Sequence, residues 1–152
     1  MHVEVDTTID RSVEDVFERL TRISEYSSWL PGSMVFTTCR QTSEGPVVAG
    51  TTYEDVTKLG TLRGEVSELA APMRVVFRET LRWLGRPIME ARMEYALRLD
   101  GAGRAEVHHI ADGELRGVLG LAEPVLGIVA RRERQRTIDA LKRSLEASLA
   151  RG

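Results

Sequence analysis

The sequence predicts an α+β fold, in which a curved, seven-stranded antiparallel sheet wraps around a long C-terminal helix and two short helices follow the first strand. Three observations lead to this prediction. A segment of alternating apolar and polar residues at 2–9 runs directly into a capped amphipathic helix. Strand-like segments separated by turn residues fill most of residues 34–115. An apolar stripe with helical spacing closes the chain between residues 130 and 150.

The N-terminal elements follow from alternation and capping signals. Residues 2–9 alternate in polarity with a period of two, as a half-buried strand does. Ser12 is a helix-capping residue, and Asp15 three positions later completes an acidic variant of the capping box. The helix that follows carries one apolar stripe, made of Val13, Val16, Phe17 and Leu20. We expect this helix to end near Arg22 and a second short helix to span residues 23–29.

Six further strands follow from β-prone segments that are bounded by glycine, proline and aspartate. We expect them at residues 34–41, 51–59, 61–69, 74–83, 88–99 and 104–115. Short turns join most of them, which favours antiparallel pairing. In the last strand the inner face is expected to hold Ala105, Val107, His109, Ala111 and Gly113.

The C-terminal part divides into an apolar segment and a helix. Residues 117–130 are apolar but are broken by glycines and Pro124, which we expect to interrupt any long rigid helix. We interpret this segment as a lid or entrance, with a dimer surface or a lipid-touching patch as alternatives. The final helix is expected over residues 130–150. Its stripe consists of Ile138, Leu141, Leu145 and Leu149 and projects back through Arg134 and Arg131.

Composition limits the class of protein. The 152 residues are expected to form one domain, 1–152, with a core of its own. A net charge of −2 without a basic stripe argues against a nucleic-acid partner. The single Cys39 cannot form an internal disulfide, which favours a cytoplasmic location, and the preference for arginine over lysine hints at a bacterial source. We find no signal peptide, and no apolar run reaches the ~20 residues of a membrane span.

No motif for metal or nucleotide chemistry is present in the sequence. His108 and His109 are adjacent on a predicted strand, so their side chains point to opposite faces and cannot share a metal. Cysteine clusters, paired histidines with a carboxylate, and phosphate-binding glycine loops are missing from the sequence. We therefore expect neither a metal nor a cofactor.

A curved sheet over one helix predicts an internal cavity. One helix of leucine and isoleucine cannot fill the concave side of a long curled sheet unless large side chains plug the gap, and the chain has only three Phe, three Tyr and two Trp. Cavities of this kind are common sites for small molecules. The expected wall consists of Trp29, Phe36, Phe77, Met89, Met93 and Tyr95. For any single one of these residues, a place in the plain core is the first interpretation.

Five stretches of the sequence together carry a family resemblance. They are I-D-R-S-V-E-D-V-F at 9–17, the corner Trp29-Leu30-Pro31, V-S-E-L-A-A-P-M-R-V at 66–75, the strand start G-R-A-E-V at 103–107, and L-K-R-S-L-E at 141–146. In this order the chain resembles the polyketide cyclase/dehydrase and lipid-transport superfamily, the START-like or Bet v 1-like (SRPBCC) helix-grip proteins. The resemblance covers nearly the whole chain and implies the helix-grip fold. Its members include cyclases, lipid carriers and hormone receptors, so function follows only by analogy.

Two residues are candidate acid–base groups. Glu79 shares its strand face with Val75, Phe77 and Leu81, and a carboxyl in an apolar cavity has a raised pKa and can carry protons. The alternative is that Glu79 pairs with Arg131 or Arg134. His109 shares its face with apolar residues and could accept a proton or bond a ligand carbonyl. The alternative is a core histidine bonded to the backbone or to Tyr95.

Arg131 and Arg134 extend the buried stripe of the final helix. A guanidinium near the cavity could clamp a ligand carboxylate or phenolate. The alternative is that each arginine lies at the helix end and reaches water.

We expect the chain to bind a small hydrophobic molecule, such as a lipid, polyketide or aromatic metabolite, between the sheet and the C-terminal helix. The first alternative is a metal-free cyclase or aromatase in which Glu79 or His109 moves the proton and Arg131 or Tyr95 polarises a carbonyl. A weaker alternative is an interaction protein that forms homodimers. Stable membrane insertion is not expected.

Overall fold

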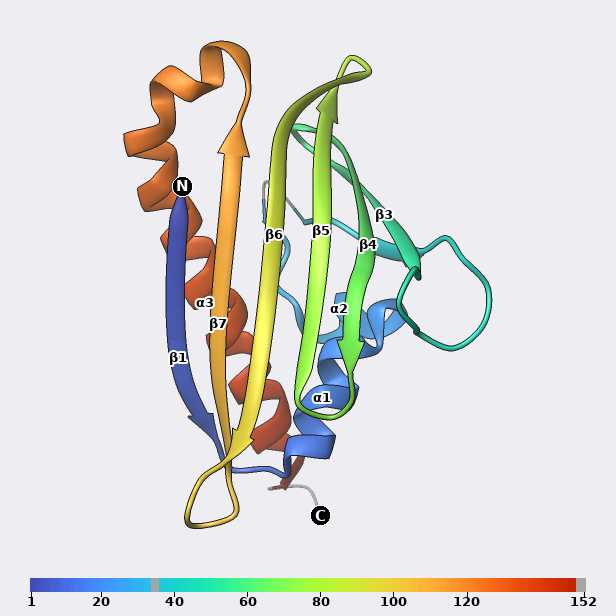
Figure 1. Cartoon of the computed structure of the whole chain (residues 1–152), viewed down its shortest axis with the longest axis vertical. Coiled ribbons are helices and arrows are strands. Elements are labelled where there is room, and N and C mark those ends of the chain that lie inside the picture. The colour runs from blue at the N-terminus through green and yellow to red at the C-terminus, as the bar shows by residue number, and fades with distance from the viewer. Residues whose placement is uncertain (34–35, 150–152) are drawn as a thin grey trace.

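The computed structural model describes residues 1–33 and 36–149 (Figure 1). Its helical elements are α1 (Val13–Thr21), the 3-10 turn η1 (Ile23–Glu25), α2 (Tyr26–Trp29), the 3-10 segment η2 (Gly117–Ala122) and α3 (Glu123–Leu149). Its strands are β1 (His2–Ile9), β2 (Cys39–Gln41), β3 (Thr52–Thr57), β4 (Gly60–Ala70), β5 (Arg74–Trp83), β6 (Arg86–Leu99) and β7 (Ala105–Leu115). The predicted α+β helix-grip fold is confirmed.

All seven strands form one antiparallel sheet in the order β1-β7-β6-β5-β4-β3-β2. The curved sheet lies in front of α3, which crosses behind β1, β7 and β6 with the short helices beside it (Figure 1). The core between these layers contains fully buried side chains from both, such as Ile9, Val66 and Val107 of the sheet and Ile138 and Leu141 of α3. Burial of these two apolar faces holds the layers together.

The N-terminal helix begins where the capping signal predicts. The Asp15 amide donates a 3.1 Å hydrogen bond to Ser12 Oγ, which satisfies one of the free N–H groups of the first turn. Arg11 pairs with the Asp15 carboxylate at 2.9 Å. The predicted stripe is buried, and it consists of Val13, Val16, Phe17 and Leu20. This helix packs against β6, β7 and α3.

The second strand is shorter than expected over the described residues. Met34 and Val35, with which we expected it to begin, lie outside the described residues, and β2 starts only at Cys39. The physical reason lies in Asp55. Its carboxylate accepts hydrogen bonds from the Thr37 and Thr38 amides at 2.9 and 3.0 Å, so these amides are satisfied without a strand ladder.

The C-terminal helix begins earlier than expected, at Glu123 instead of residue 130. The expectation that Pro124 interrupts it was wrong, because a proline in the first helical turn lacks only an N–H that has no partner there anyway. Leu149 was expected in the buried stripe but is 50% exposed. The buried face runs from Arg134 to Leu145, while Ala150, the expected last residue, lies outside the described range.

One row of residues across the inner face of the sheet contains two glycines and an alanine, so it carries little side-chain volume. Tyr53, Gly64, Glu79, Ala91 and Gly113 are consecutive partners on β3, β4, β5, β6 and β7. Gly64 is required here because a Cβ at this position would lie 2.2 Å from Tyr53 Cζ. The Tyr53 ring therefore lies across the Gly64 backbone and reaches the side chain of Glu79.

No helix in the described part of the chain is both long and apolar enough to cross a membrane.

Candidate functional site

A small cavity lies between the sheet and α3. Its volume is about 20 Å³, which is room for about one water molecule. Its wall consists of Leu20, Tyr26, Trp29, Leu30, Phe36, Tyr53, Phe77, Glu79, Met93, Tyr95, Arg134 and Thr137. The position agrees with the expected site, but the open apolar space that we predicted is almost completely occupied by side chains in this structure.

Aromatic rings account for the filling. Tyr53 contacts Phe77 edge-to-face with 6.0 Å between ring centroids, and Phe77 contacts Tyr95 in the same way at 6.1 Å. Tyr95 in turn stacks on the His109 ring at 4.1 Å. The rings come from β3, β5, β6 and β7, so they form a continuous layer across the inner face of the sheet. The sequence supplies few aromatic residues, but half of its six Phe and Tyr residues lie in this layer.

A separate group of side chains covers the cavity. Trp29 and Tyr26 of α2 contact each other edge-to-face at 5.3 Å, and the Tyr26 hydroxyl donates to the Leu20 carbonyl. Leu30 and Phe36 follow in the connection to β2. The indole Nε1 of Trp29 is buried and has no hydrogen-bond partner in the described part of the chain. Tyr26, Trp29, Leu30 and Phe36, called the cover below, pack on the core, and the Trp29 indole N–H adds no hydrogen bond to this packing.

Glu79 points inward and is held by Tyr53. The carboxylate is only 7% exposed, and Oε1 accepts a 2.6 Å hydrogen bond from the Tyr53 hydroxyl. Burial raises the pKa of Glu79, while the Tyr53 bond and the charge of Arg134 oppose that rise. The pKa of Tyr53 is also raised, first by burial and then by the nearby Glu79 charge. Such a carboxyl is able to exchange protons with a group in the cavity.

Arg134 enters the same cavity from α3. Its Nη1 donates to Met93 Sδ at 3.0 Å, and its guanidinium carbon lies 5.8 Å from the centre of the Phe36 ring. The expected alternative for Glu79 was an ion pair with Arg131 or Arg134. Among the described residues neither arginine forms an ion pair with Glu79, and Tyr53 is the hydrogen-bond partner instead.

His109 is fully buried and lies behind Tyr95. Its Nδ1 is 2.9 Å from the Glu94 carbonyl oxygen, so this nitrogen carries the hydrogen, and its Nε2 has no partner in the described part of the chain. Burial, aided by the positive charge of Arg134, lowers the pKa of His109 to about 3. The ring does not line the cavity, so it has no direct access to a guest there.

Most of the predicted wall residues are brought together. The structure places Trp29, Phe36, Phe77, Glu79, Met93, Tyr95 and Arg134 around one cavity. Met89 does not line it, because this residue pairs with Leu81 and Leu115 near the far end of the sheet. Arg131 is exposed and does not line the cavity.

Sequence reasoning missed five wall residues, which are Leu20, Tyr26, Leu30, Tyr53 and Thr137. For Thr137 a signal was present, because it follows Arg134 by three positions on the same helix face. Tyr53 had a weaker signal in the alternation of residues 51–59. Its contact with Glu79 depends on the register of three strands, which the sequence alone does not give.

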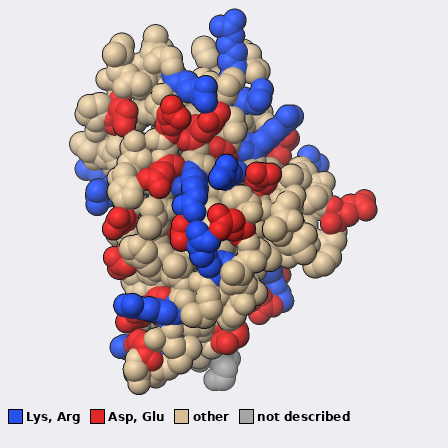
Figure 2. Space-filling view, in the orientation of Figure 1, with Lys and Arg blue, Asp and Glu red and all other residues tan. Residues whose placement is uncertain are grey.

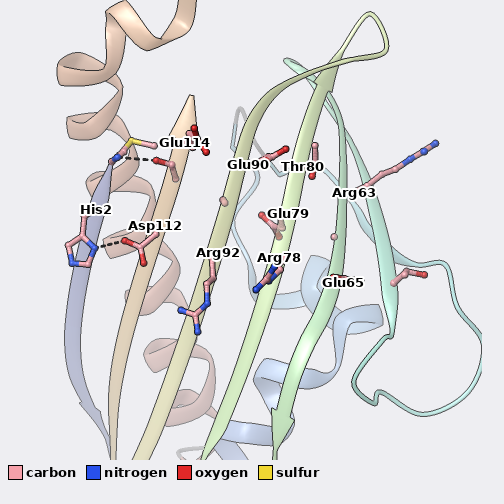
Figure 3. A pocket seen from close by; sticks show the side chains of 15 residues that line it. His2, Arg63, Glu65, Arg78, Glu79, Thr80, Glu90, Arg92, Asp112 and Glu114 are labelled. Carbon is pink, nitrogen blue, oxygen red and sulfur yellow. Dashed lines mark hydrogen bonds and ion pairs between the residues drawn. The ribbon is translucent and has the colours of Figure 1, made fainter. Parts of the chain in front are cut away.

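A larger hollow of about 850 Å³ lies on the solvent face of the sheet (Figure 3). Its floor is the backbone of the row that holds Gly64, Glu79, Ala91 and Gly113. Its sides are the two flanking rows of outward side chains, which are Arg63, Thr80, Glu90 and Glu114 on one side and Glu65, Arg78, Arg92 and Asp112 on the other. Charges of both signs are interspersed on this face (Figure 2), as is typical of a solvated sheet surface.

The segment 117–130 does not form the expected lid. None of its residues lines the cavity, and Val118, Leu121, Val125, Ile128 and Val129 are between 46% and 88% exposed. If the chain formed homodimers, as in the weaker alternative, this exposed apolar surface would be the contact. Elsewhere in residues 1–33 and 36–149, no three His, Cys, Asp or Glu side chains gather as a metal-binding group.

A curved antiparallel sheet that holds a long terminal helix and encloses an aromatic cavity defines a helix-grip protein. A family model described as polyketide cyclase / dehydrase and lipid transport matches residues 1–146. The chain therefore belongs to this family.

Solved structures show the same fold at low sequence identity. A conserved protein from Geobacillus kaustophilus has a TM-score of 0.76 and 14% identity, with 97% of each chain covered. A START superfamily protein from Mycobacterium smegmatis has a TM-score of 0.72 and 12% identity, with 96% of this chain and 97% of that chain covered. DynU16, a protein in the dynemicin biosynthetic locus, has a TM-score of 0.66 and 18% identity, with 97% of this chain covered. This chain spans only 48% of DynU16. The comparison with curated proteins gave no match.

Proposed function

We propose that this chain binds a small apolar molecule in the cavity between the sheet and α3. The observation that carries the proposal is the composition of the cavity wall, which is aromatic and aliphatic except for Thr137 and the two ionisable residues Glu79 and Arg134. Apolar pockets with a few convergent polar groups are typical of small-molecule sites. Membership of a family described by polyketide and lipid chemistry supports the same class of guest.

Binding requires the cavity to enlarge, and movement of the cover would make the space for a guest. Trp29, Leu30 and Phe36 belong to neither the sheet nor α3, so they can move aside without breaking the strand ladder. The unpartnered Trp29 indole N–H loses no hydrogen bond in such a movement. Burying about 300 Å² of an apolar guest would supply roughly 7 kcal/mol before the costs of association and ordering are subtracted. This is sufficient for a weak to moderate complex.

Filling the cavity from α3 should block binding. We expect N-phenyl-1-naphthylamine, a neutral apolar fluorophore, to increase in fluorescence when it is titrated with the protein. The variant Thr137→Phe places a ring in the cavity, because Thr137 is buried in its wall, and should weaken this binding at least tenfold. The control is Gln135→Phe, which adds the same ring at an exposed position of the same helix. No fluorophore binding by the wild type, or equal binding by Thr137→Phe, would refute the proposal.

A second candidate function is catalytic, and the position of Glu79 favours it. A carboxyl with a raised pKa in the cavity wall is a stronger base than an exposed one once it is ionised. In a cyclisation, Glu79 would remove a proton from the carbon between two ketone groups of a polyketide. The resulting enolate would attack a third carbonyl and form the carbon–carbon bond, and the alkoxide would take up the proton. Tyr95 lines the same cavity and is able to donate a hydrogen bond to the attacked carbonyl.

Removing the acid should separate catalysis from binding. For a synthetic poly-β-ketone whose cyclised product is measured by mass spectrometry, Glu79→Gln is expected to lower the turnover rate about 100-fold or more. The amide keeps the shape of the side chain, so the dissociation constant of the neutral fluorophore should change less than about threefold. The control is Glu65→Gln, which removes an exposed carboxylate from the neighbouring strand. Unchanged turnover in Glu79→Gln would exclude this role.

A further inference from the structure

Arg134 is a buried cation whose contacts are neutral. The side chain is only 8% exposed, and its partners carry no negative charge: they are the thioether sulfur of Met93, the hydroxyl of Tyr95 and the face of the Phe36 ring. A guanidinium carries five N–H donors, and charged side chains are almost never buried without a partner of opposite charge. No carboxylate of the described residues forms an ion pair with it, whereas Arg74 and Arg92 on the solvent face each pair with Glu94 at 2.8 Å. The charge in the cavity is thus more weakly paired than the charges on the surface.

The acid in the same cavity does not neutralise Arg134 by contact. Glu79 directs Oε1 to the Tyr53 hydroxyl at 2.6 Å, on the side of β3. Burial raises the pKa of Glu79, which favours its neutral form, and the charge of Arg134 only partly opposes this. The wall therefore presents a cation at α3 and a hydrogen-bonded carboxyl at β5, with the cavity between the elements that carry them.

The present partners of Arg134 are easily replaced. A thioether sulfur is a weak hydrogen-bond acceptor, and the Tyr95 hydroxyl oxygen is an uncharged one. Phe36 belongs to the cover that must move when a guest enters. A carboxylate accepts two parallel N–H bonds from a guanidinium, and such charge-assisted bonds are about twice as strong as neutral ones. The buried Trp29 Nε1–H, also in the wall, offers a further donor to an oxygen of the guest.

We propose that the guest of this cavity is an apolar carboxylic acid, whose hydrocarbon or aromatic body takes the place of the cover and whose carboxylate pairs with Arg134. This inference rests on the proposed binding function and names the class of molecule for the same site. It assigns to Arg134 the recognition of the charged end of the guest. The aromatic layer on the sheet contacts the apolar body.

Matched acids and esters test the inference directly. We would displace N-phenyl-1-naphthylamine at pH 7.5 with decanoate, methyl decanoate, 2-naphthoate and methyl 2-naphthoate. The wild type is expected to bind at least one acid tenfold or more tighter than its ester. Arg134→Met should remove this preference while the affinity for the esters changes less than about threefold. Arg131→Met removes an exposed arginine three residues earlier on α3 and should keep the preference.

The possible outcomes are distinguishable. Equal binding of acid and ester by the wild type would overturn this inference and leave the proposed binding function intact. A protein that binds neither the fluorophore nor any ester would overturn the proposed function itself. Loss of the acid preference in Arg131→Met as well would show that general surface charge, not the cavity cation, attracts the acid. If Arg134→Met does not fold by circular dichroism, Arg134→Lys keeps the charge without the planar fork, and the preference should fall by at least threefold.

Discussion

Lowering the pH from 7 to 3 is expected to remove roughly 4 kcal/mol from the free energy of unfolding through a single side chain, His109. Burial lowers the pKa of His109 from 6.5 to about 3 in the folded protein. Because the folded pKa lies below the unfolded one, the unfolded chain binds the proton first as the pH falls. The contribution to stability is therefore complete above pH 6.5 and is lost as the pH falls toward about 3.

Urea unfolding between pH 3.5 and 7.5 measures this effect. His109→Asn retains a side-chain N–H in the region of Nδ1 but cannot titrate, so its stability should depend less on pH than that of the wild type. The variant also loses the stacking on Tyr95, which lowers stability at every pH and leaves the slope unaffected. The control is His108→Asn, because His108 is the adjacent histidine on the opposite, solvent face, where it contacts Asp6. If the free energy of unfolding of His109→Asn depended on pH as steeply as that of the wild type, this ring would not control acid unfolding.

The buried carboxyl of Glu79 changes the stability in the opposite direction over part of the same pH range. Burial raises the pKa of Glu79 above 4.5, so its contribution to stability is present below that pH and is lost as the pH rises through the folded pKa. The wild-type curve contains both effects. Only the difference between the wild type and His109→Asn isolates the histidine.

The variant Gly64→Ala is expected to cost about 3 kcal/mol of folding free energy, far more than one added methyl group usually does. The new Cβ would lie 2.2 Å from Tyr53 Cζ and 2.5 Å from its hydroxyl oxygen. Tyr53 is itself buried at 3% exposure and holds Glu79, so the ring cannot move without breaking that hydrogen bond. Thermal or urea unfolding measures the loss.

A double-mutant cycle attributes this cost to its cause. In a Tyr53→Ala background the space above Gly64 is free, and Gly64→Ala should then cost at least 1 kcal/mol less than it does in the wild type, on the order of typical coupling energies. Gly101→Ala is the control for the general effect of the substitution, because nothing lies within 4 Å of the added atom. Additive costs at Tyr53 and Gly64 would be incompatible with the close contact in the structure.

The elements with the clearest periodicity were predictable from the sequence. Alternation placed β6 within two residues at its start and assigned the inner face of β7, including His109, correctly. The capping signal at Ser12 located α1 because it depends on neighbours only three residues away. Short-range patterns therefore located these elements. The start of α3 was missed because the same proline that ends a helix in its interior is well tolerated in its first turn.

The site was harder to predict because it depends on which residues of the helices and the sheet face each other in the folded protein. Arg131 and Arg134 lie on one face of an ideal helix, but only Arg134 lies under the cover formed by residues such as Phe36. The partner of Glu79 comes from two strands away, across Gly64. The volume of the cavity depends on how aromatic rings from four strands pack, and no pattern of residues along the chain encodes that volume.

The closed interior has a kinetic consequence. A space of about 20 Å³ admits nothing larger than water, so under the proposed function an apolar guest enters only after Trp29, Leu30 and Phe36 have moved outward. If about 1% of molecules are open at any moment, the apparent affinity is about 100-fold weaker than that of the open form. The observed association rate then reaches a plateau set by opening instead of rising in proportion to guest concentration. Escape is gated in the same way, so a guest taken up slowly is also retained for a long time.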